Sequence, residues 1–406
     1  MVDSNNAPAG APATATPPEP ATEPQPAPEP VTDQQSPPNP AREPETPTEL
    51  ATETQSPPRP ANEPQSEILP ASHWAQVPLP EEPQDDGDDD SAYGEAASST
   101  ASLSASVLEY RTLHGRTFHS DMGKAESWIP NDEQQQDSMD IHHHMCTLAL
   151  EDKLFLAPLQ PEKIQKVVDI GTGTGIWAID FADKFPNAEV IGTDVSPIQP
   201  PWVPPGVKFE LDDANLPWTW ADNTFDYVHV RCLFGSIVDW SALYREAFRC
   251  CKPGGWFEDF ENSINMLSDD GSVAPGSPMD QWGQVFWAGG EKFGRTFRVV
   301  EDEIQRKCME EAGFVDITVW EHRCPIGTWP SDPRLKTLGQ FSKMVLESDA
   351  EGYVLYMWNA VMGWSPEEIQ VYLAHLRRQL RDKNTHASYR QTVVYGRKPE
   401  PDEVRA

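Results

Sequence analysis

The sequence has few cysteines, few basic residues and no long apolar run. Its six cysteines are scattered without the spacing of metal ligands, and no secretory signal precedes them: Cys146, Cys232, Cys250, Cys251, Cys308 and Cys324. We therefore expect free thiols in a reducing compartment. No apolar stretch approaches the ~18 residues that a membrane span requires. These absences favour a soluble intracellular protein, in the cytoplasm or the nucleus, without membrane contact.

Basic residues are scarce along the whole chain. There are 31 Lys and Arg against 65 Asp and Glu, which gives a formal net charge of −34 over 406 residues. The first 100 residues hold 19 acids and 2 basic residues, and the rest of the chain is acidic too. No stripe of Lys and Arg follows one face or one segment, so we expect no direct binding of nucleic acid.

Residues 1–100 are a low-complexity segment with 22 of the 41 prolines. A Pro/Glu-rich repeat begins at Pro17, Pro37 and Pro57, a spacing of 20 residues. Such a segment buries too little apolar surface to offset its ordering entropy, so we expect a disordered tail with polyproline-II character. It is either a solubilising spacer or a docking site for regulatory protein partners. One apolar island around Trp74 interrupts it, and we do not expect this island to anchor a partner protein.

The centre of the sequence is a glycine-rich stretch at residues 167–179. A β-branched run leads into Gly171, Gly173 and Gly175, and helical apolar spacing follows, which predicts a strand, a tight loop and a helix. Such a loop can cradle a nucleotide, because glycine permits positive φ and the helix offers free N–H groups. A dinucleotide fingerprint needs a sixth-position glycine where Ile176 stands, and the Lys-Ser/Thr pair of a P-loop is absent.

Acidic residues stand near the ends of three successive predicted strands. Asp169 lies two residues before the first glycine, where a carboxylate repels phosphate but accepts from an ammonium group. Asp194 follows Gly171 by 23 residues, about where a ribose-binding carboxylate belongs. Asp213 ends the next strand and could accept from an adenine amino group. This pattern favours a ligand with a cationic amino-acid end and an adenosine end, which describes S-adenosylmethionine.

At this point the sequence resembles the S-adenosylmethionine-dependent methyltransferases, and among them the fungal LaeA-like group associated with secondary metabolism. The stretches that carry the resemblance span residues 108–399: 169–180, 192–205, 225–226, 235–240, 253–258, 311–314 and 363–366. Among these, the Ser-Pro-Ile-Gln-Pro run at 196–200 is the most specific. The resemblance implies a Rossmann-like α/β fold with a mostly parallel seven-stranded sheet, a helical lead-in and a helical insertion before the last strand.

The resemblance also assigns residues to a cofactor site for S-adenosyl-L-methionine. Asp169, Gly171, Thr172, Gly173 and Gly175 would hold the methionine end, with Asp194 at the ribose and Asp213 at the adenine. The next strand, 225–230, ends at Arg231, and ligands bind beyond the carboxyl ends of such strands. We therefore expect Arg231 beside the cofactor and His229 beside the transferred methyl group. His229 is either a general base or part of the pocket wall, because methyl transfer needs little beyond alignment.

The lead-in, residues 101–160, is predicted to be helical. Apolar spacing indicates a helix over 102–118, and the resemblance makes Tyr110, Arg116 and His119 candidates for a lid over the cofactor; alternatively they clamp this arm to the domain. A second helix begins with Asp132 as cap and Gln135 completing a capping box. Its three adjacent histidines, 142–144, point about 100° apart and cannot converge on one metal ion.

The remaining elements follow from spacing and from turn residues. Helices are predicted at 240–251 and 301–312, and strands at 256–261, with Glu258, Asp259 and Glu261, and at 316–322. These acids either touch a substrate or are solvated. Three insertion helices (336–347, 352–362 and 365–381) precede a last strand at 391–397. Their aromatic and methionine residues are expected to pack rather than to line a substrate pocket: Phe341, Met344, Tyr353, Tyr356, Met357 and Trp358.

The sequence thus predicts a disordered tail (1–100), a helical lead-in (101–160) and a methyltransferase domain (161–400). The leading hypothesis is an enzyme that methylates a small secondary metabolite or a protein side chain. The alternative is a LaeA-like nuclear regulator that keeps the cofactor site and acts through protein partners. The tail suits a regulator, whereas the intact glycine loop and the strand-end acids suit an enzyme.

Overall fold

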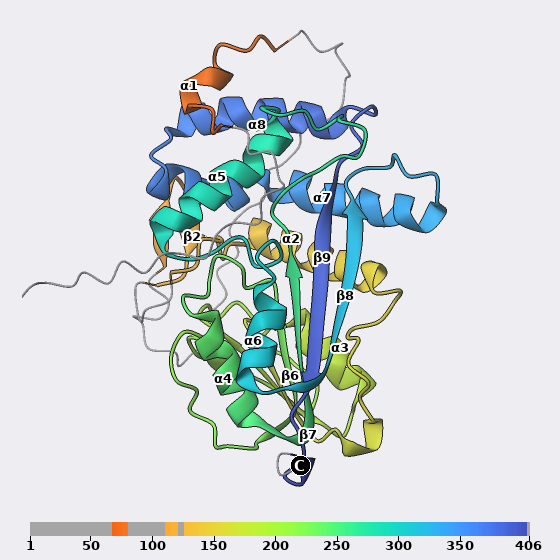
Figure 1. Cartoon of the computed structure of the whole chain (residues 1–406). Coiled ribbons are helices and arrows are strands. Elements are labelled where there is room, and N and C mark those ends of the chain that lie inside the picture. Colours follow the sequence, from red (N-terminus) through yellow and green to blue (C-terminus); the bar gives the residue numbers. More distant parts are fainter. Residues whose placement is uncertain (1–66, 80–109, 121–125, 404–406) are drawn as a thin grey trace, which may run out of the picture. The chain divides into compact units, whose positions relative to one another are not determined.

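A computed structural model describes residues 67–79, 110–120 and 126–403 of the chain (Figure 1). Most of the predicted tail, and residues 101–109 of the predicted lead-in, lie outside these ranges. The helices in the described ranges are α1 (Ala71–Trp74), α2 (Glu133–Ala149), α3 (Ile176–Lys184), α4 (Trp240–Cys250), α5 (Pro278–Phe293), α6 (Ile304–Ala312), α7 (Pro333–Leu355) and α8 (Pro366–Arg381). A 3-10 turn spans Pro161–Lys163 and a π-helical turn spans Tyr356–Val361.

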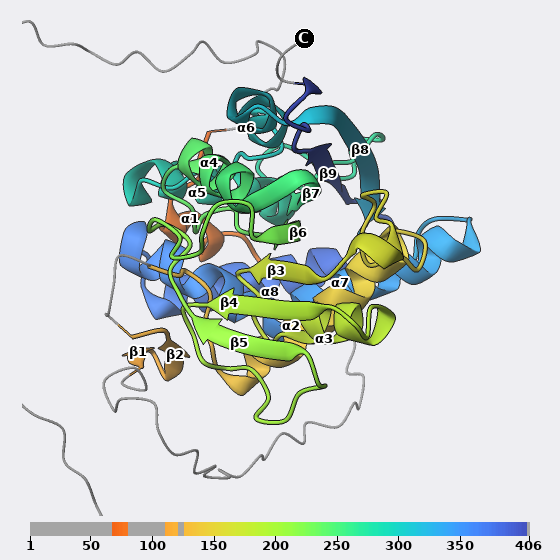
Figure 2. The same ribbon diagram turned by 90° about the horizontal axis from the view of Figure 1, so that it is seen from below.

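Seven strands form the central sheet, in the order β5-β4-β3-β6-β7-β9-β8. They are β3 (Lys166–Ile170), β4 (Glu189–Asp194), β5 (Val207–Leu211), β6 (Phe225–Arg231), β7 (Cys251–Asn262), β8 (Val315–Pro325) and β9 (Ser388–Arg397). The first five are parallel, and β9 runs antiparallel between β7 and β8. The strand order reverses between β3 and β6, and a view from below shows the whole sheet (Figure 2). This is the expected fold, and a ligand site is expected at that reversal.

Both faces of the sheet are covered by helices because the strands are apolar on both sides. On one face α3 packs through Trp177 and Phe181 against Val167, Val190 and Tyr227. On the other face α4 and α6 pack against the alternate side chains of β3, β6 and β7. The central strands β3, β4, β6 and β7 are therefore mostly buried, whereas the edge strand β8 is largely exposed, so a ligand can meet polar groups of the central strands only beyond their ends.

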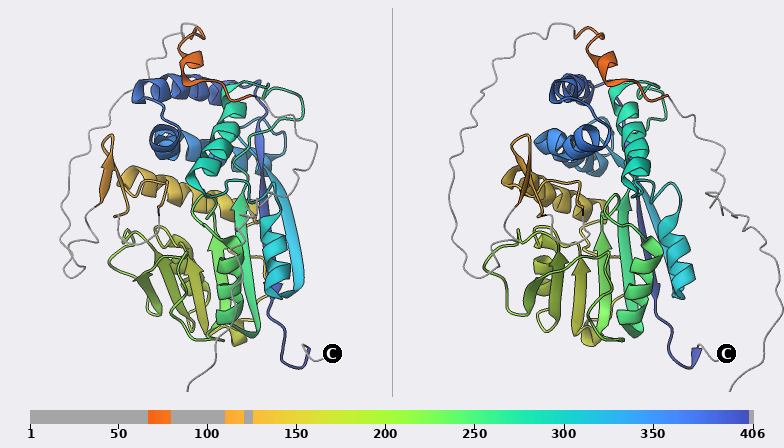
Figure 3. Two further views of the ribbon diagram at one scale, coloured as in Figure 1. Left: turned by 60° about the vertical axis from the view of Figure 1, so that its left-hand side comes forward. Right: turned by 90° about the vertical axis from the view of Figure 1, so that its left-hand side faces the viewer.

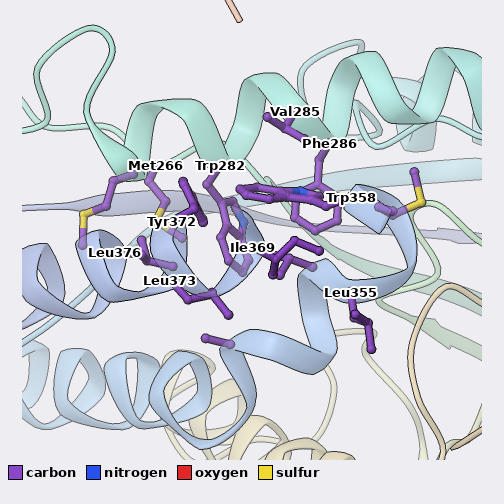
Figure 4. Packing of buried hydrophobic residues seen from close by; sticks show 14 of the residues in the cluster. Met266, Trp282, Val285, Phe286, Leu355, Trp358, Ile369, Tyr372, Leu373 and Leu376 are labelled. Atoms are coloured by element: carbon purple, nitrogen blue, oxygen red, sulfur yellow. The ribbon is translucent and has the colours of Figure 1, made fainter. Parts of the chain in front are cut away.

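A helical layer lies over the carboxyl ends of the parallel strands. It contains α2, α5, α7, α8 and α1, and Figure 3 shows it above the sheet from two sides. Its core is aromatic: the Trp358 ring lies 4.1 Å from that of Tyr372, and Trp282 packs on Phe286 at 5.3 Å between ring centroids (Figure 4). These side chains come from α5, the π-helical turn and α8, so the layer is one packed unit. It closes the cavity described below from above.

The insertion helices match the prediction with one change. Helices 336–347 and 352–362 join into α7 with a kink at Asp349 (φ −149°, ψ 48°) followed by the π-helical turn. Of the six aromatic and methionine residues, Met357 and Trp358 are buried in the helical core. Only Tyr353 of the six lines the cavity. Phe341, Tyr356, Met357 and Trp358 pack as expected, whereas Met344 is 39% exposed. Helix α5 was not predicted, although Ser277 caps it and Pro278 and Gly294 mark its two ends.

The helix predicted over 102–118 is wrong for residues 111–118. These residues form a hairpin of β1 (Arg111–Leu113) and β2 (Arg116–Phe118). His114 (φ 49°) and Gly115 (φ 84°) form its two-residue turn. Two successive positive φ angles match the right-handed twist of a hairpin and cannot occur within an α-helix. The apolar spacing on which the prediction depended was too short to distinguish the two structures.

Part of the predicted tail is folded. Residues 67–79 include α1, whose Trp74 is 2% exposed and packs edge-on against Tyr372 at 5.2 Å. The backbone carbonyl of Trp74 lies 3.1 Å from His375 Nε2. The expectation of disorder is therefore wrong for this island, which sequence reasoning placed in the tail because its flanks are polar; its contacts are within the chain and do not test the expectation about a partner.

The structure also describes the state of the cysteines and the character of the helices. All six cysteines are free thiols. Within residues 67–79, 110–120 and 126–403, no helix is both long and apolar enough to cross a membrane.

Candidate functional site

A cavity of about 280 Å³ lies where the strand order reverses, between the sheet and the helical layer. One half, the strand-end half, is lined by the ends of β3, β4, β5 and β6 and the loops that follow them. The other half, the helical half, is lined by α2, α5, α7 and the chain segments at the end of β7 and the start of β9. Of the predicted site residues the cavity brings together Asp169, Gly171, Thr172, Gly173, Asp194, Asp213 and Arg231.

The glycine loop has the backbone that the sequence predicts. Gly171, Gly173 and Gly175 have φ of 70°, 58° and 81°, and Gly175 is the residue that caps α3. Gly171 and Gly173 line the cavity, whereas Gly175 lies beneath the loop against Phe209. Asp169 lies behind the loop, and its two oxygens accept from Thr172 Oγ1 at 2.6 Å and from His229 Nδ1 at 2.7 Å. The loop is therefore held from below by a buried carboxylate.

Asp194 shapes the next side of the cavity. Its Oδ2 accepts from the backbone N–H of Gly173 at 2.8 Å, and its Oδ1 accepts from that of Ser196 at 2.9 Å. Burial raises its pKa to about 6, against the lowering effect of these hydrogen bonds. The carboxylate joins the glycine loop to the Ser-Pro-Ile-Gln-Pro run. Gln199 of that run completes the link, since its Nε2 donates to the Gly173 carbonyl at 2.6 Å.

Asp213 carries an unsatisfied oxygen at the edge of the cavity. Its Oδ1 accepts from the backbone N–H of Asn215 at 2.9 Å and from Asn215 Nδ2 at 3.1 Å. Its Oδ2 is buried and has no hydrogen-bond partner among the described residues. A buried carboxylate oxygen without a donor is costly, so the site is complementary to a ligand that brings a donor, such as an amino group.

His229 does not line the cavity, so the structure gives no support to its expected place beside the reacting atoms. The residue is 1% exposed, and its ring stacks on Trp177 at 3.7 Å with an interplanar angle of 2°. Burial lowers its pKa, although Asp169 acts in the opposite direction. The register pairs His229 directly beside Asp169 on the neighbouring strand, so the imidazole lies behind that carboxylate. It can position Asp169 but cannot take a proton from a substrate.

Arg231 lines the cavity beneath α2. Its Nη2 lies 3.1 Å from His143 Nδ1, and His143 Nε2 lies 3.0 Å from Asp180 Oδ2. Among the described residues no carboxylate lies within ion-pairing distance of the Arg231 guanidinium. The cavity therefore contains a cation that is available to an anionic group of a ligand.

The lid candidates lie outside the cavity. Arg116 forms two bidentate ion pairs, with Asp132 and with Asp349, at N–O distances of 2.6–2.7 Å. His119 is 2% exposed and accepts from the Ser127 backbone N–H at 2.8 Å. Neither they nor Tyr110 line the cavity, so the structure favours the clamp over the lid. In the part of the chain that is described, no group of histidine, cysteine or acidic residues could hold a metal ion.

The three acids of β7 neither touch the cavity nor face solvent, which differs from both expectations. Glu258, Asp259 and Glu261 are at most 1% exposed. Glu258 accepts from the backbone N–H of Leu156 (2.9 Å) and Ala157 (2.6 Å). Glu261 accepts from the backbone N–H groups of Leu233 and Phe234, which line the cavity. These carboxyls anchor loops, one of which forms a cavity wall.

The buried Glu258 gives a prediction about pH. Burial raises its pKa to about 7, above the ~4.3 of an unfolded glutamate. The folded chain thus binds a proton that the unfolded chain releases, and the free energy of unfolding falls as the pH rises from about 4.5 to about 7. Urea unfolding at pH 5 and pH 8 measures this decrease. We expect the decrease in the free energy of unfolding between the two pH values to be smaller in Glu258→Gln than in the wild type, by an amount on the order of 3 kcal/mol. Glu310→Gln changes a side chain that is 57% exposed and should leave the pH dependence of the free energy of unfolding unchanged. An equal pH dependence in the two variants would contradict the assignment of this proton to Glu258.

Sequence reasoning missed the residues of the helical half of the cavity. Asp132 caps α2 as predicted, but Gln135 does not complete the capping box and instead lies in the cavity wall. Gln135, Met139 and His142 recur at i, i+4 and i+7, the spacing of one helix face. That spacing was visible in the sequence, but it does not say which face meets a cavity.

Comparison with known proteins agrees with this architecture. A family model described as a methyltransferase domain matches residues 141–319. Methyltransferase pytC of Aspergillus terreus is 39% identical over 305 residues, which are 74% of this chain and 92% of that protein. The secondary metabolism regulator laeA of Aspergillus niger is 32% identical over 328 residues (80% and 86%). Methyltransferase tdiE of Emericella nidulans, described as probable, is 33% identical over 261 residues (64% and 80%).

Among solved structures, phosphoethanolamine N-methyltransferase 2 of Haemonchus contortus in complex with S-adenosyl-L-methionine is 18% identical. The match covers 65% of this chain and 52% of that one, with a TM-score of 0.37. The family assignment depends on the relatives that are more than 30% identical and on the lengths they share with the chain. The chain therefore belongs to the fungal LaeA-like family of S-adenosylmethionine-dependent methyltransferases.

Proposed function

We propose that this methyltransferase binds S-adenosyl-L-methionine in the strand-end half of the cavity and transfers its methyl group to a small molecule in the helical half. The observation that carries the cofactor's placement is the unsatisfied Oδ2 of Asp213 at the far edge from the glycine loop. A carboxylate oxygen that needs a donor suits the amino group of an adenine. The glycine loop, at the other edge, admits close approach of a ligand backbone.

The remaining contacts follow from the positions of the charged groups. Asp194, between loop and adenine site, would accept from the ribose hydroxyls, and Arg231 would bind the cofactor's carboxylate as its available cation. Gly171, Thr172 and Gly173 would hold the methionine end together with Asp169, which His229 positions from behind. Gly175 would act through the loop conformation. The cofactor supplies an electrophilic methyl carbon, and the protein contributes alignment of the acceptor with it.

Isothermal titration with S-adenosylmethionine tests the cofactor site. We expect the wild type to bind and Asp194→Ala to bind roughly 30- to 100-fold more weakly, because two charge-assisted contacts and a loop anchor are lost. Asp269→Ala, whose side chain is 86% exposed and outside the cavity, should bind as the wild type does. No heat from the wild-type protein would reject the proposal.

A second function is favoured by the relatives named as regulators of secondary metabolism. In that proposal the chain binds the same cofactor in the cytoplasm or nucleus and acts through protein partners, with residues 1–66 as a docking segment. The cavity's second half supports the first function, since a regulator needs no chamber beyond the cofactor. Transfer of a labelled methyl group to small molecules of a cell extract, compared with transfer to its proteins, distinguishes the two.

A further inference from the structure

The helical half of the cavity contains two buried polar side chains without partners. Gln135 on α2 is 0% exposed, and neither its Oε1 nor its Nε2 has a hydrogen-bond partner among the described residues. Ser342 on α7 is 2% exposed, and its Oγ is likewise without a partner. Both residues line the cavity. Since most buried polar groups in proteins are hydrogen-bonded, two such side chains in one wall indicate a ligand that satisfies them.

The surrounding groups can take this role only in part, since Gln135 interacts with Tyr353, and Ser342 interacts with Tyr389 and Cys324. Tyr353 lies beside Gln135, but its hydroxyl is 3.0 Å from Ser138 Oγ, whose own proton is donated to the Val345 carbonyl at 3.1 Å. Tyr353 therefore donates to Ser138 and has no proton for the Gln135 carbonyl. Tyr389, which lies beside Ser342, directs its hydroxyl to Met145 Sδ at 3.6 Å. The Tyr353 oxygen can still accept from the Gln135 amide N–H, so only the Gln135 carbonyl is left without a possible donor.

The charge of this half excludes some acceptors. The aspartates of the cavity all belong to the strand-end half, and Glu126, the one glutamate among the described residues that line the cavity, pairs with Arg295 at 3.1 Å. Burial, Arg231 and His143 lower the pKa of His142 to about 3, so this imidazole is neutral at pH 7. Its Nε2 accepts from Asn262 Nδ2 at 3.0 Å. A cationic acceptor such as a lysine side chain would find no carboxylate there, whereas a neutral molecule meets no unpaired charge.

The distance from the glycine loop also fits an acceptor site. Met139 Sδ lies 3.5 Å from where a Cβ of Gly173 would be, so Met139 marks the boundary between the two halves. Gln135 precedes Met139 by one helical turn, about 6 Å along α2. Trp282 and Tyr389 supply flat apolar walls around this point. Gln135 therefore lies in the cavity wall about one helical turn from the glycine loop, in a chamber that aromatic side chains also line.

We propose that the Gln135 carbonyl recognises the methyl acceptor, and that the acceptor is a small, uncharged, planar molecule with an N–H donor, as in a lactam. The lactam N–H donates to the Gln135 carbonyl and supplies the donor that the described residues lack. This inference rests on the proposed function for the position of the cofactor, but it concerns a different half of the cavity.

Isothermal titration with 2-quinolone and with coumarin tests the recognition, in the presence of S-adenosylhomocysteine. The two probes are neutral and nearly isosteric, and differ in that coumarin has a ring oxygen where 2-quinolone has the lactam N–H. We expect wild-type protein to bind 2-quinolone at least ~10-fold more tightly, because coumarin leaves the Gln135 carbonyl unpaired. In Gln135→Leu this ratio should fall to within about threefold of unity.

The matched control is Gln134→Leu, the same substitution one residue earlier on the exposed face of α2, which should keep the wild-type ratio. Thermal unfolding provides a second readout. Replacement of an unsatisfied buried amide by an apolar side chain of similar size should leave the midpoint of Gln135→Leu equal to or above that of the wild type. A lowered midpoint would make Gln135 a structural residue and overturn the proposal.

Other outcomes also decide the matter. Equal affinity of the wild type for both probes, no binding of either, or an unchanged ratio in Gln135→Leu would each overturn the inference. Competition by a lysine-containing peptide would do so as well. Titration of the same proteins with S-adenosylmethionine separates the proposed function from this inference. If the cofactor binds but the affinities for 2-quinolone and coumarin are equal, only the assignment of the acceptor fails. If the cofactor does not bind, the proposed function fails first.

Discussion

Replacement of Arg116 by alanine is expected to lower the free energy of unfolding by about 3–5 kcal/mol. The guanidinium is 12% exposed and binds both oxygens of Asp132 and both oxygens of Asp349, whose side chain is fully buried. Burial already raises the pKa of Asp349, and Arg116 is the main group that acts in the opposite direction. Without it, a buried carboxylate would be left next to a second carboxylate.

The effect of this substitution should reach the cavity. Asp132 caps α2 through the backbone N–H of Gln135, and Asp349 accepts from the backbone N–H of Gly352 at the kink of α7. These two helices form the walls of the helical half of the cavity. We therefore expect Arg116→Ala to weaken binding of S-adenosylmethionine as well, measured by titration alongside urea unfolding.

Two further variants make the Arg116 prediction specific. Arg323→Ala removes an ion pair whose side chains are 45% and 86% exposed, and should change the free energy of unfolding by less than about 1 kcal/mol. Asp349→Asn combined with Arg116→Ala should recover part of the loss, because the uncompensated buried charge is gone. If Arg116→Ala were no more destabilising than Arg323→Ala, the ion pairs of Arg116 would make no special contribution to the stability of the fold.

The second large effect is expected from Gly175→Ala. Gly175 has φ 81°, and a Cβ there would lie 2.3 Å from Phe209 Cζ and 2.7 Å from Phe209 Cε1. Left-handed backbone strain and overpacking together predict a loss of about 2–4 kcal/mol in the free energy of unfolding. The backbone N–H of Gly175 donates to the Thr172 carbonyl at 3.0 Å, so the shift would also deform the loop that lines the cavity. S-adenosylmethionine should bind at least ~10-fold more weakly.

Gly271→Ala is the control for backbone strain alone. Gly271 has φ 77°, but a Cβ there would meet no atom within 4 Å. The difference between the two variants therefore measures the contact with Phe209, and Gly175→Ala combined with Phe209→Leu should recover part of it. Equal destabilisation by the two alanine variants, with unchanged cofactor binding, would show that the glycine loop tolerates a side chain at this position.

The part of the site that sequence reasoning located correctly depends on local rules. Glycine spacing predicts a loop between β3 and α3, and acids near the ends of parallel strands lie at one edge of a sheet. Asp169, Asp194 and Asp213 needed no knowledge of distant contacts to be placed there. The Ser-Pro-Ile-Gln-Pro run was recognised by resemblance, and the structure supplies its physical basis in the hydrogen bonds of Gln199 to Gly173 and Ser196.

The expectations that the structure does not support arose where a local pattern had two solutions. His229 precedes the end of β6 by two residues, and nothing in its own strand reveals that Trp177 of α3 covers it. Gln135 fits a capping box, yet its side chain turns to the cavity because α7 packs beside α2. In both cases the competing contact comes from an element far away in the chain.

By itself the sequence determined the strands of the central sheet, the glycine loop and the carboxylates at one edge of the sheet, since each follows from residues close together in the chain. Only the tertiary structure decided that α2 and α7 close a second chamber, that Arg116 joins them and that the β7 acids hold loops instead of a ligand. Arg116 and Asp349 are 233 residues apart, and Glu258 accepts from a backbone group 102 residues away, so burial by distant elements sets the energies of these contacts. The residue pattern of one segment does not show which distant side chains will cover that segment in the folded protein.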